Sequence, residues 1–514
     1  MRSYISLLLI SCLVWTVIIG CPDYPTPVKI DTQHPILLKA YAEVDALLQE
    51  RMQENGIKSF MATIVYQDDL VWSNTYGKVN PLDPNSPPLS IDNNIRIASI
   101  TKSFGTLMMY QLRDKGVLSL DEPVNKYYPE FTIMNPFITK KDITFRQLAS
   151  HQAGLPREVP CNFDMLDDPN VCGEETIMEN LAKYILILPQ YQTAHYSNLG
   201  LALLGRTCEK AAKQKYEDYV EEKILSPLGM DRSTYNYSAV KDNMAIGMHL
   251  DNGTYSVANI TLFGWGTPMG GLFSTGRDMA KYCSFWLSDG GDILDSSTMN
   301  EAIVSTVYLV NDGQSSFGTP WETMYSTGLQ NNLWIRMKGG ALDGYRSQLA
   351  MVREYGVGVF FSSLMYISTP DLFVGDAMNI LLPAFDQVLR EAQAPPELSG
   401  YPAEAFIGIY EYEGSIFRVQ MLNGSLQADF GDDNYFSFMD FLPEFPTVKR
   451  IQIMNTNPYM CMFINDGENY ELCYFTISGD HATSALVMGQ EMLLTSKDPT
   501  IPIHPKRSHH RFLL

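Results

Sequence analysis

The segment Arg96-Ile97-Ala98-Ser99-Ile100-Thr101-Lys102 places a serine and a lysine three positions apart, where an apolar, strand-like run meets the start of a helix. Three positions are nearly one helical turn, so we expect Ser99 and Lys102 to share a face. Serine is a weak nucleophile at neutral pH, and it needs a group that takes its proton and donors that hold the resulting oxyanion. The pair therefore predicts acyl transfer through Ser99.

Ser-x-x-Lys is weak evidence by itself, because Ser238-Ala239-Val240-Lys241 is a second copy. Two further motifs follow Ser99 in order: Tyr196-Ser197-Asn198 is the only Tyr-x-Asn in the chain, and Lys338-Gly339-Gly340 is the only Lys-x-Gly. With the residues that connect them, the three motifs resemble the serine β-lactamase and penicillin-binding protein superfamily, on the branch of class C β-lactamases, DD-carboxypeptidases and animal β-lactamase-like proteins. The resemblance covers roughly residues 35 to 390.

The resemblance implies an α+β, β-lactamase/transpeptidase-like fold, in which helices and a helical subdomain flank an antiparallel sheet. It implies that Lys102 and Tyr196 lie close to Ser99, and that Asn198 orients Lys102 and the acyl side chain. Lys338 would help to keep Tyr196 partly ionised, because a nearby positive charge favours a phenolate. The base stays open between Lys102 and Tyr196, since coupled groups need not have separable roles.

The same resemblance implies a substrate strand that runs through Gly339, Gly340 and Ala341. The acyl carbonyl oxygen would lie between the backbone N–H groups of Ser99 and Ala341. Many relatives have Lys-Thr-Gly here, and Gly339 lacks the hydroxyl that binds a substrate carboxylate. We therefore expect weak affinity for penicillin-like acids. His151 invites a catalytic interpretation, but the resemblance assigns it to a structural turn, where a hydrogen-bonded packing role is the better expectation.

The N-terminus is typical of a secretory signal: Met1-Arg2 precedes an apolar run that ends at Gly20-Cys21-Pro22. We predict a signal peptide over residues 1–20. An uncleaved anchor and a lipoprotein box ending at Cys21 are the alternatives. Four Asn-x-Ser/Thr triplets favour plain secretion of a glycoprotein, and they begin at Asn236, Asn252, Asn259 and Asn423.

The composition excludes several classes of function. The chain has 514 residues, 45% of them hydrophobic, and a net charge of -21, so it can form a large core but would repel nucleic acid. No spacing of Cys and His resembles a zinc box, and we predict neither a metal nor another cofactor. The eight cysteines fit an oxidising compartment, and the pairs Cys161–Cys172 and Cys461–Cys473 are the expected disulfides.

Periodicity divides the chain further. A helix is expected over residues 35–55 and a hairpin over Phe60–Tyr66 and Leu70–Tyr76. The predicted catalytic domain spans 35–391, followed by a proline-rich linker over 392–402, a β-rich domain over 403–497 and a tail over 498–514. The β-rich domain should be a small barrel or sandwich, and it weakly resembles the lipocalin-like tail of some serine peptidases.

These observations predict a secreted serine hydrolase that acts through an acyl-enzyme on a small amide, peptide or ester. The expected partner is a small acyl substrate, with no nucleic acid and no membrane beyond the possible N-terminal anchor. A non-catalytic binding protein and a self-assembling structural protein are the alternatives, although the complete set of Ser/Lys, Tyr/Asn and Lys/Gly motifs argues against a degenerate site. The substrate and the oligomeric state stay open.

Overall fold

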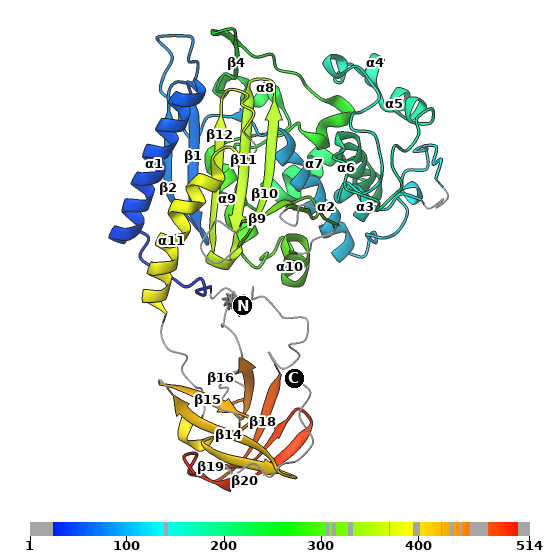
Figure 1. Cartoon of the computed structure of the whole chain (residues 1–514). Coiled ribbons are helices and arrows are strands. Elements are labelled where there is room, and N and C mark those ends of the chain that lie inside the picture. The colour runs from blue at the N-terminus through cyan, green and yellow to red at the C-terminus, as the bar shows by residue number, and fades with distance from the viewer. Residues whose placement is uncertain are drawn as a thin grey trace, which may run out of the picture. The chain divides into compact units, whose positions relative to one another are not determined.

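The computed structural model describes residues 24–137, 142–304, 308–310, 315–326, 333–369, 371–393, 401–422, 424–431, 436–440, 445–452 and 471–501. The chain divides into two compact units (Figure 1). One unit is Pro25–Gln393, and the other comprises Ala394–Leu514 together with Met1–Tyr24. Each unit buries its own cluster of hydrophobic side chains.

An antiparallel sheet of eight strands forms the centre of the first unit, in the order β2-β1-β12-β11-β10-β9-β8-β7 (Figure 1). The expected hairpin is present as its first two strands, and the expected α+β fold is confirmed. The strands are β1 (Phe60–Tyr66), β2 (Asp69–Tyr76), β7 (Tyr308–Leu309), β8 (Ser315–Phe317), β9 (Glu322–Ser326), β10 (Leu333–Leu342), β11 (Tyr345–Val352) and β12 (Val357–Ser363).

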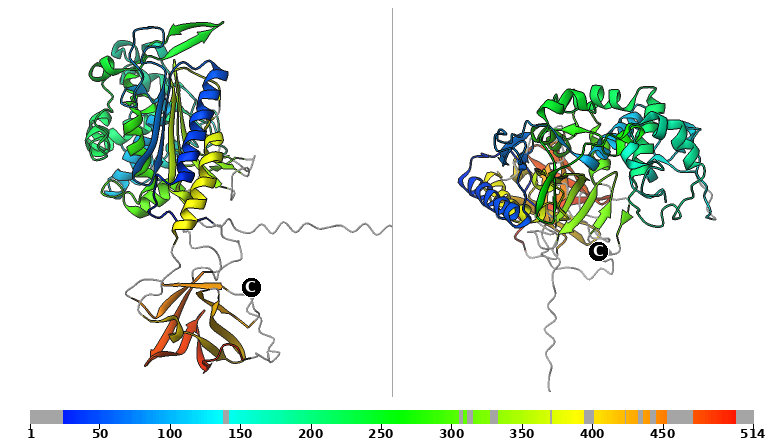
Figure 2. Two further views of the ribbon diagram at one scale, coloured as in Figure 1. Left: turned by 90° about the vertical axis from the view of Figure 1, so that its left-hand side faces the viewer. Right: turned by 90° about the horizontal axis from the view of Figure 1, so that it is seen from above.

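Helices cover both faces of this sheet (Figure 2). On one face α1 (Pro35–Asn55) packs along α11 (Val374–Ala392), and on the other α9 (Gly276–Leu287) packs on β1, β11 and β12. The buried residues of α1 include Leu37, Tyr41, Val44 and Leu48, at the spacing that predicted this helix. The central strands β1 and β12 are buried along their whole length, as this two-sided covering requires.

The helical region packs beside the sheet and begins with α2 (Lys102–Asp114), whose first eleven residues are all buried. It includes α3 (Phe145–Ala149), α4 (Pro169–Cys172), α5 (Glu174–Leu181), α6 (Asn198–Ala212), α7 (Tyr216–Val220), α8 (Tyr237–Val240) and α10 (Ser296–Val304). Two short sheets complete the unit: β3 (Ile95–Arg96) with β6 (Phe273–Ser274), and β4 (Met248–Asp251) with β5 (Thr254–Val257).

The second unit is a closed antiparallel barrel in which each strand pairs with the next and β13 pairs with β20. Its strands are β13 (Gly408–Tyr412), β14 (Ser415–Leu422), β15 (Ser425–Asp429), β16 (Phe436–Asp440), β17 (Val448–Gln452), β18 (Leu472–Ser478), β19 (His481–Val487) and β20 (Gln490–Ser496). Aromatic side chains, among them Phe406, Tyr410, Phe417 and Phe475, dominate its interior. The small all-β domain is therefore confirmed, and its lipocalin-like character stays a prediction.

Of the two expected disulfides, Cys161–Cys172 is present, with Cα atoms 5.8 Å apart. Cys461 lies outside the described residues, so its pairing with Cys473 stays a prediction. The predicted signal peptide also lies outside them, as does most of the predicted linker and tail. Within the described part of the chain, no helix combines the length and the apolar character that crossing a membrane requires.

Candidate active site

Ser99 lies in a tight turn between β3 and α2. The expected α-helix does not begin at Ser99: a 3₁₀ turn, Ala98–Thr101, comes first, and α2 begins at Lys102. Ala98 has φ +51°, a left-handed conformation that costs an L residue free energy and that is common at functional turns. This turn holds Ser99 partly exposed, while its neighbours Ala98 and Ile100 are buried.

Lys102 contacts Ser99 directly, as the spacing predicted. Its Nζ lies 2.9 Å from Ser99 Oγ and 2.5 Å from the carbonyl oxygen of Met269, and its side chain is fully buried. Burial lowers the pKa of Lys102, and nearby Lys338 lowers it further against the opposing effect of Tyr196. A lysine with a lowered pKa is more readily the neutral amine, which can accept the serine proton.

Tyr196 completes this group from the start of α6. Ser197 caps the helix by accepting a hydrogen bond from the Gly200 N–H at 2.8 Å, which fixes the position of the residue before it. The Tyr196 hydroxyl lies beside Ser99, and this contact helps to lower the pKa of Tyr196. Burial alone would raise its pKa, but Lys102 and Lys338 hold the pKa below its usual value by favouring the phenolate.

The cations lie close to the Tyr196 ring. Lys102 Nζ is 5.2 Å and Lys338 Nζ is 5.1 Å from the ring centroid, and the Arg157 guanidinium is 5.1 Å from it. The structure therefore brings Ser99, Lys102, Tyr196 and Lys338 together, although they come from three distant segments of the chain. The acceptor of the serine proton stays open, because the pKa values of both Lys102 and Tyr196 are lowered.

Strand β10 passes close to the Ser99 turn because it carries glycine at position 340. A Cβ atom on Gly340 would lie 2.1 Å from the carbonyl oxygen of Ile97, closer than any side chain allows. Ala341, the next residue, is exposed, and beyond Met337 this edge of β10 is no longer paired with β9. The strand can therefore present backbone groups to a substrate beside Ser99, as the Lys-x-Gly motif implied.

Glu322, at the start of β9, was not predicted. Its carboxylate accepts a hydrogen bond from Lys338 Nζ at 2.7 Å and one from the Gly339 N–H at 3.4 Å. Burial would lower the pKa of Lys338, but Glu322 and Tyr196 together raise it. Nothing in the residues around Glu322 signalled this contact, since only the strand register places it one position from Lys338.

Asn198 lies in a different environment from the expected one. Its side-chain nitrogen donates to the Glu158 carboxylate, at 2.8 Å and 3.1 Å from the two oxygens, whereas the amine of Lys102 contacts Ser99 and Met269. Asn198 is the first residue of α6 and only partly buried, so its short side chain meets the neighbouring Arg157-Glu158 loop. This structure does not support the expected contact between Asn198 and Lys102.

His151 has the structural role that was expected of it, and it lies directly beside the candidate active site. Its Nδ1 accepts a hydrogen bond from the Ser197 N–H at 3.0 Å, and its ring stacks on Tyr196 with the centroids 4.5 Å apart. Burial, together with Lys338 and Lys102, lowers the pKa of His151 well below its usual value. The neutral ring therefore supports Tyr196 from one side and adds no positive charge.

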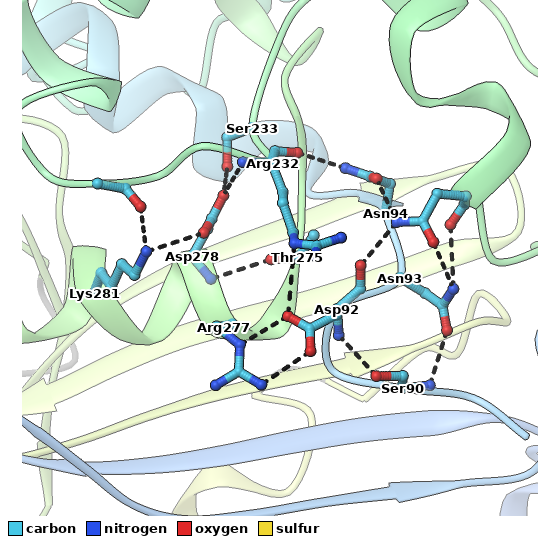
Figure 3. Close-up of polar contacts among 12 residues, drawn as sticks. Ser90, Asp92, Asn93, Asn94, Arg232, Ser233, Thr275, Arg277, Asp278 and Lys281 are labelled. Atoms are coloured by element: carbon cyan, nitrogen blue, oxygen red, sulfur yellow. Dashed lines mark hydrogen bonds and ion pairs between the residues drawn. The ribbon is translucent and has the colours of Figure 1, made fainter.

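A polar network supports the strand that leads into the Ser99 turn (Figure 3). Asp92 binds Arg277 at the start of α9 through two hydrogen bonds, of 2.7 and 2.9 Å, and Asn94 donates to the carbonyl of Arg232 at 2.6 Å. The buried carboxylate of Asp278 accepts from the Ser233 hydroxyl and from the Arg232 N–H. These contacts fix the segments next to β3 and β6, and β3 leads directly into the turn that carries Ser99.

The geometry suits nucleophilic chemistry at an acyl carbon. A serine, two groups able to take its proton and an open strand edge meet at one point, which is the arrangement that an acyl-enzyme mechanism requires. The second Ser-x-x-Lys copy is elsewhere, with both Ser238 and Lys241 exposed. Among the residues that the structure describes, no group of three or more His, Cys, Asp or Glu side chains is arranged to hold a metal ion.

Comparison with known proteins agrees with the site. The Beta-lactamase family model matches residues 44–371. The chain is 50% identical to Beta-lactamase-like protein 2 of Dictyostelium discoideum, over 97% of this chain and 95% of that protein. It is 28% identical to the D-alanyl-D-alanine-carboxypeptidase/endopeptidase AmpH of Escherichia coli K12, over 58% of this chain and 78% of that protein.

The fold has solved counterparts too. The octameric penicillin-binding protein homologue from Pyrococcus abyssi matches with a TM-score of 0.57 and 20% identity, over 88% of this chain and 99% of that one. At this level of sequence identity the match supports the fold alone. Taken with the extent of the family match, the fold and the motifs identify the chain as a member of the Beta-lactamase family, a membership that suggests serine hydrolase activity.

Proposed function

We propose that the protein is a secreted serine hydrolase that forms an acyl-enzyme at Ser99 and acts on a small amide, peptide or ester. The observation that carries the proposal is the contact of Lys102 Nζ with Ser99 Oγ at 2.9 Å, with the Tyr196 side chain beside the same serine. Keeping the Lys102 amine buried beside this serine without a chemical role would be costly, because a buried amine loses its hydration.

The reaction would proceed in two stages. Ser99 Oγ attacks the carbonyl carbon while its proton passes to the Lys102 amine or the Tyr196 phenolate, and the tetrahedral intermediate places its negative oxygen at the strand edge beside Ala341. Collapse breaks the bond to the leaving group, which takes up the proton. A water molecule then attacks the ester carbonyl at Ser99 while its proton passes to the same base. The bond between the acyl carbon and Ser99 Oγ breaks, the serine takes that proton back, and the acid product leaves.

Several lines support the proposal. The family includes the carboxypeptidase/endopeptidase AmpH, which by its name cleaves peptides, although it covers only 58% of this chain. Secretion rests on the apolar run after Met1-Arg2 and on the Asn-x-Ser/Thr triplets. In the structure Asn236, Asn252 and Asn259 are exposed, as glycan acceptors must be.

An activity-based fluorophosphonate probe tests the catalytic proposal. The purified protein is labelled, digested, and the modified peptide is sequenced. We expect the label on Ser99, and we expect its rate to rise with pH as the base loses its proton. A protein that stays unlabelled while it binds acyl ligands would instead be the non-catalytic binder.

A further inference from the structure

Two lysines border Tyr196, and among the residues that the structure describes only Lys338 is paired with a carboxylate. The described polar contacts of Lys102 Nζ are the Ser99 hydroxyl, the Met269 carbonyl and the Tyr196 side chain. Lys338 Nζ instead lies 2.7 Å from Glu322, with 1% of the lysine side chain and 32% of the glutamate side chain exposed. The negative member of this pair is therefore the one that faces the solvent.

Glu322 also lies beside the substrate strand. It is the first residue of β9, so the pairing of β9 with β10 ends there and the open edge of β10 begins just beyond. Its second carboxylate oxygen accepts from the Gly339 N–H, a backbone donor on this same edge. A ligand that approaches the Ser99 hydroxyl along β10 thus meets a carboxylate where it would otherwise meet a lysine and a free N–H group.

Arg346, on the neighbouring strand β11, is a further cation near this edge, and it is engaged with backbone oxygens. The Arg346 guanidinium donates to the carbonyls of Gly340 and Thr369, each at 3.2 Å. Its partner in the strand register is Ala341 on β10, so Arg346 flanks β10 from β11 while Glu322 flanks it from β9. The positive charge of Arg346 is therefore held along the backbone by these two carbonyl groups.

From this arrangement we propose that Glu322 determines specificity: it excludes substrates that carry a carboxylate on the leaving-group side of the scissile bond, and the cleft takes uncharged acyl esters and amides there. The inference rests on the proposed function and names its substrate class. It is independent of the missing hydroxyl at Gly339, because a like charge repels a carboxylate even where hydrogen-bond donors are present.

The test uses two esters with the same acyl group. One leaving group is 3-carboxyphenol and the other is 3-carboxamidophenol, which differ in charge but little in shape. Both esters give the same acyl-enzyme, so a difference in kcat/KM reports on acylation alone. We expect the wild type to prefer the carboxamide, and E322Q to raise the carboxylate-to-carboxamide ratio about tenfold or more, because the like-charge repulsion is removed.

Two variants control for other effects. E322D keeps the negative charge and should keep the wild-type ratio. E50Q makes the same change of charge on an exposed residue of α1 and should leave the ratio unchanged. An equal ratio in the wild type and E322Q, or a wild type that already prefers the carboxylate, would overturn the inference.

The inference can be tested even if the protein has no hydrolase activity. In S99A, calorimetry measures the binding of both intact esters, and the double variant S99A/E322Q should bind the carboxylate ester about tenfold more tightly than S99A does. Unchanged binding refutes the role of Glu322. Wild-type protein that neither turns over the carboxamide nor is labelled at Ser99 refutes the proposed function instead.

Discussion

The two Ser-x-x-Lys segments have the same spacing and opposite surroundings. Lys102 is fully buried against Ser99 at the start of α2. Ser238 and Lys241 lie on the one-turn helix α8 and the 3₁₀ turn after it, and both side chains are exposed. Spacing brings a hydroxyl and an amine to one helical face, and at Lys102 it is burial that lowers the pKa of the amine.

The second segment nevertheless leads into residues that support the strand before Ser99. The 3₁₀ turn that begins at Lys241 ends at Asn243, whose side chain donates to the Asp92 carbonyl at 2.8 Å and to Asn94 Oδ1 at 2.9 Å. The Asn243 carbonyl in turn accepts from the Asn94 N–H at 3.0 Å. One copy of the motif therefore holds the candidate nucleophile, and the other leads into a support for the strand that precedes it.

The largest expected effect is the difference in kcat/KM between variants of the two serines. S99A should lower kcat/KM for an uncharged acyl ester by at least about 10³-fold, because the attacking oxygen is lost. S238A should leave turnover unchanged, since its hydroxyl is exposed and the described contacts of Tyr196 do not include it. Comparable losses in the two purified variants would contradict the assignment of Ser99.

The lysines provide the next test. K102M should lower the acylation rate about 10²- to 10⁴-fold, because the amine that contacts Ser99 Oγ is removed while the length of the side chain is kept. K241M is the matched control, and stopped-flow labelling of both variants should find it as fast as the wild type. If K102M stays fully reactive, Lys102 has no part in activating the serine.

The pH dependence of labelling at Ser99 tests whether the charges of Lys338 and Glu322 set the pKa of the base. Lys338 lowers the pKa of both Lys102 and Tyr196, so K338M should move the acid limb of the rate profile to higher pH, whichever of the two is the base. Glu322 raises both pKa values, so E322Q should move the limb to lower pH. If the acid limb moved in the same direction in both variants, the charges of Lys338 and Glu322 would not determine its pH.

The smallest expected effect tests the supporting role of the second segment. N243A removes two donated hydrogen bonds and should lower the free energy of unfolding by about 1 to 2 kcal/mol. S238A should change it by less than about 0.5 kcal/mol, as exposed substitutions usually do. Urea unfolding of the first unit, followed by tryptophan fluorescence, measures both values; equal stabilities would remove the support we assign to Asn243.

Local sequence predicted the fold wherever a pattern is repeated along one segment. The helix over 35–55, the first hairpin and the all-β second unit follow from periodicity, and Ser99 with Lys102 follows from spacing within a turn. Glu322 and the contact of Asn198 with Glu158 could not be predicted this way. They depend on strand register and on a loop that approaches α6, which are set by packing between segments far apart in the chain.

The polar network around Asp92 and Asp278 also bears on the order in which the chain can acquire its structure. Asp92 and Arg277 are 185 positions apart, and the carboxylate that holds the Arg232 loop belongs to Asp278. During synthesis the strand before Ser99 therefore emerges long before its partners exist. A nascent chain that stops short of Asp278 lacks the anchors of this turn, so the nucleophile should become reactive only after more than half of the polypeptide has been made.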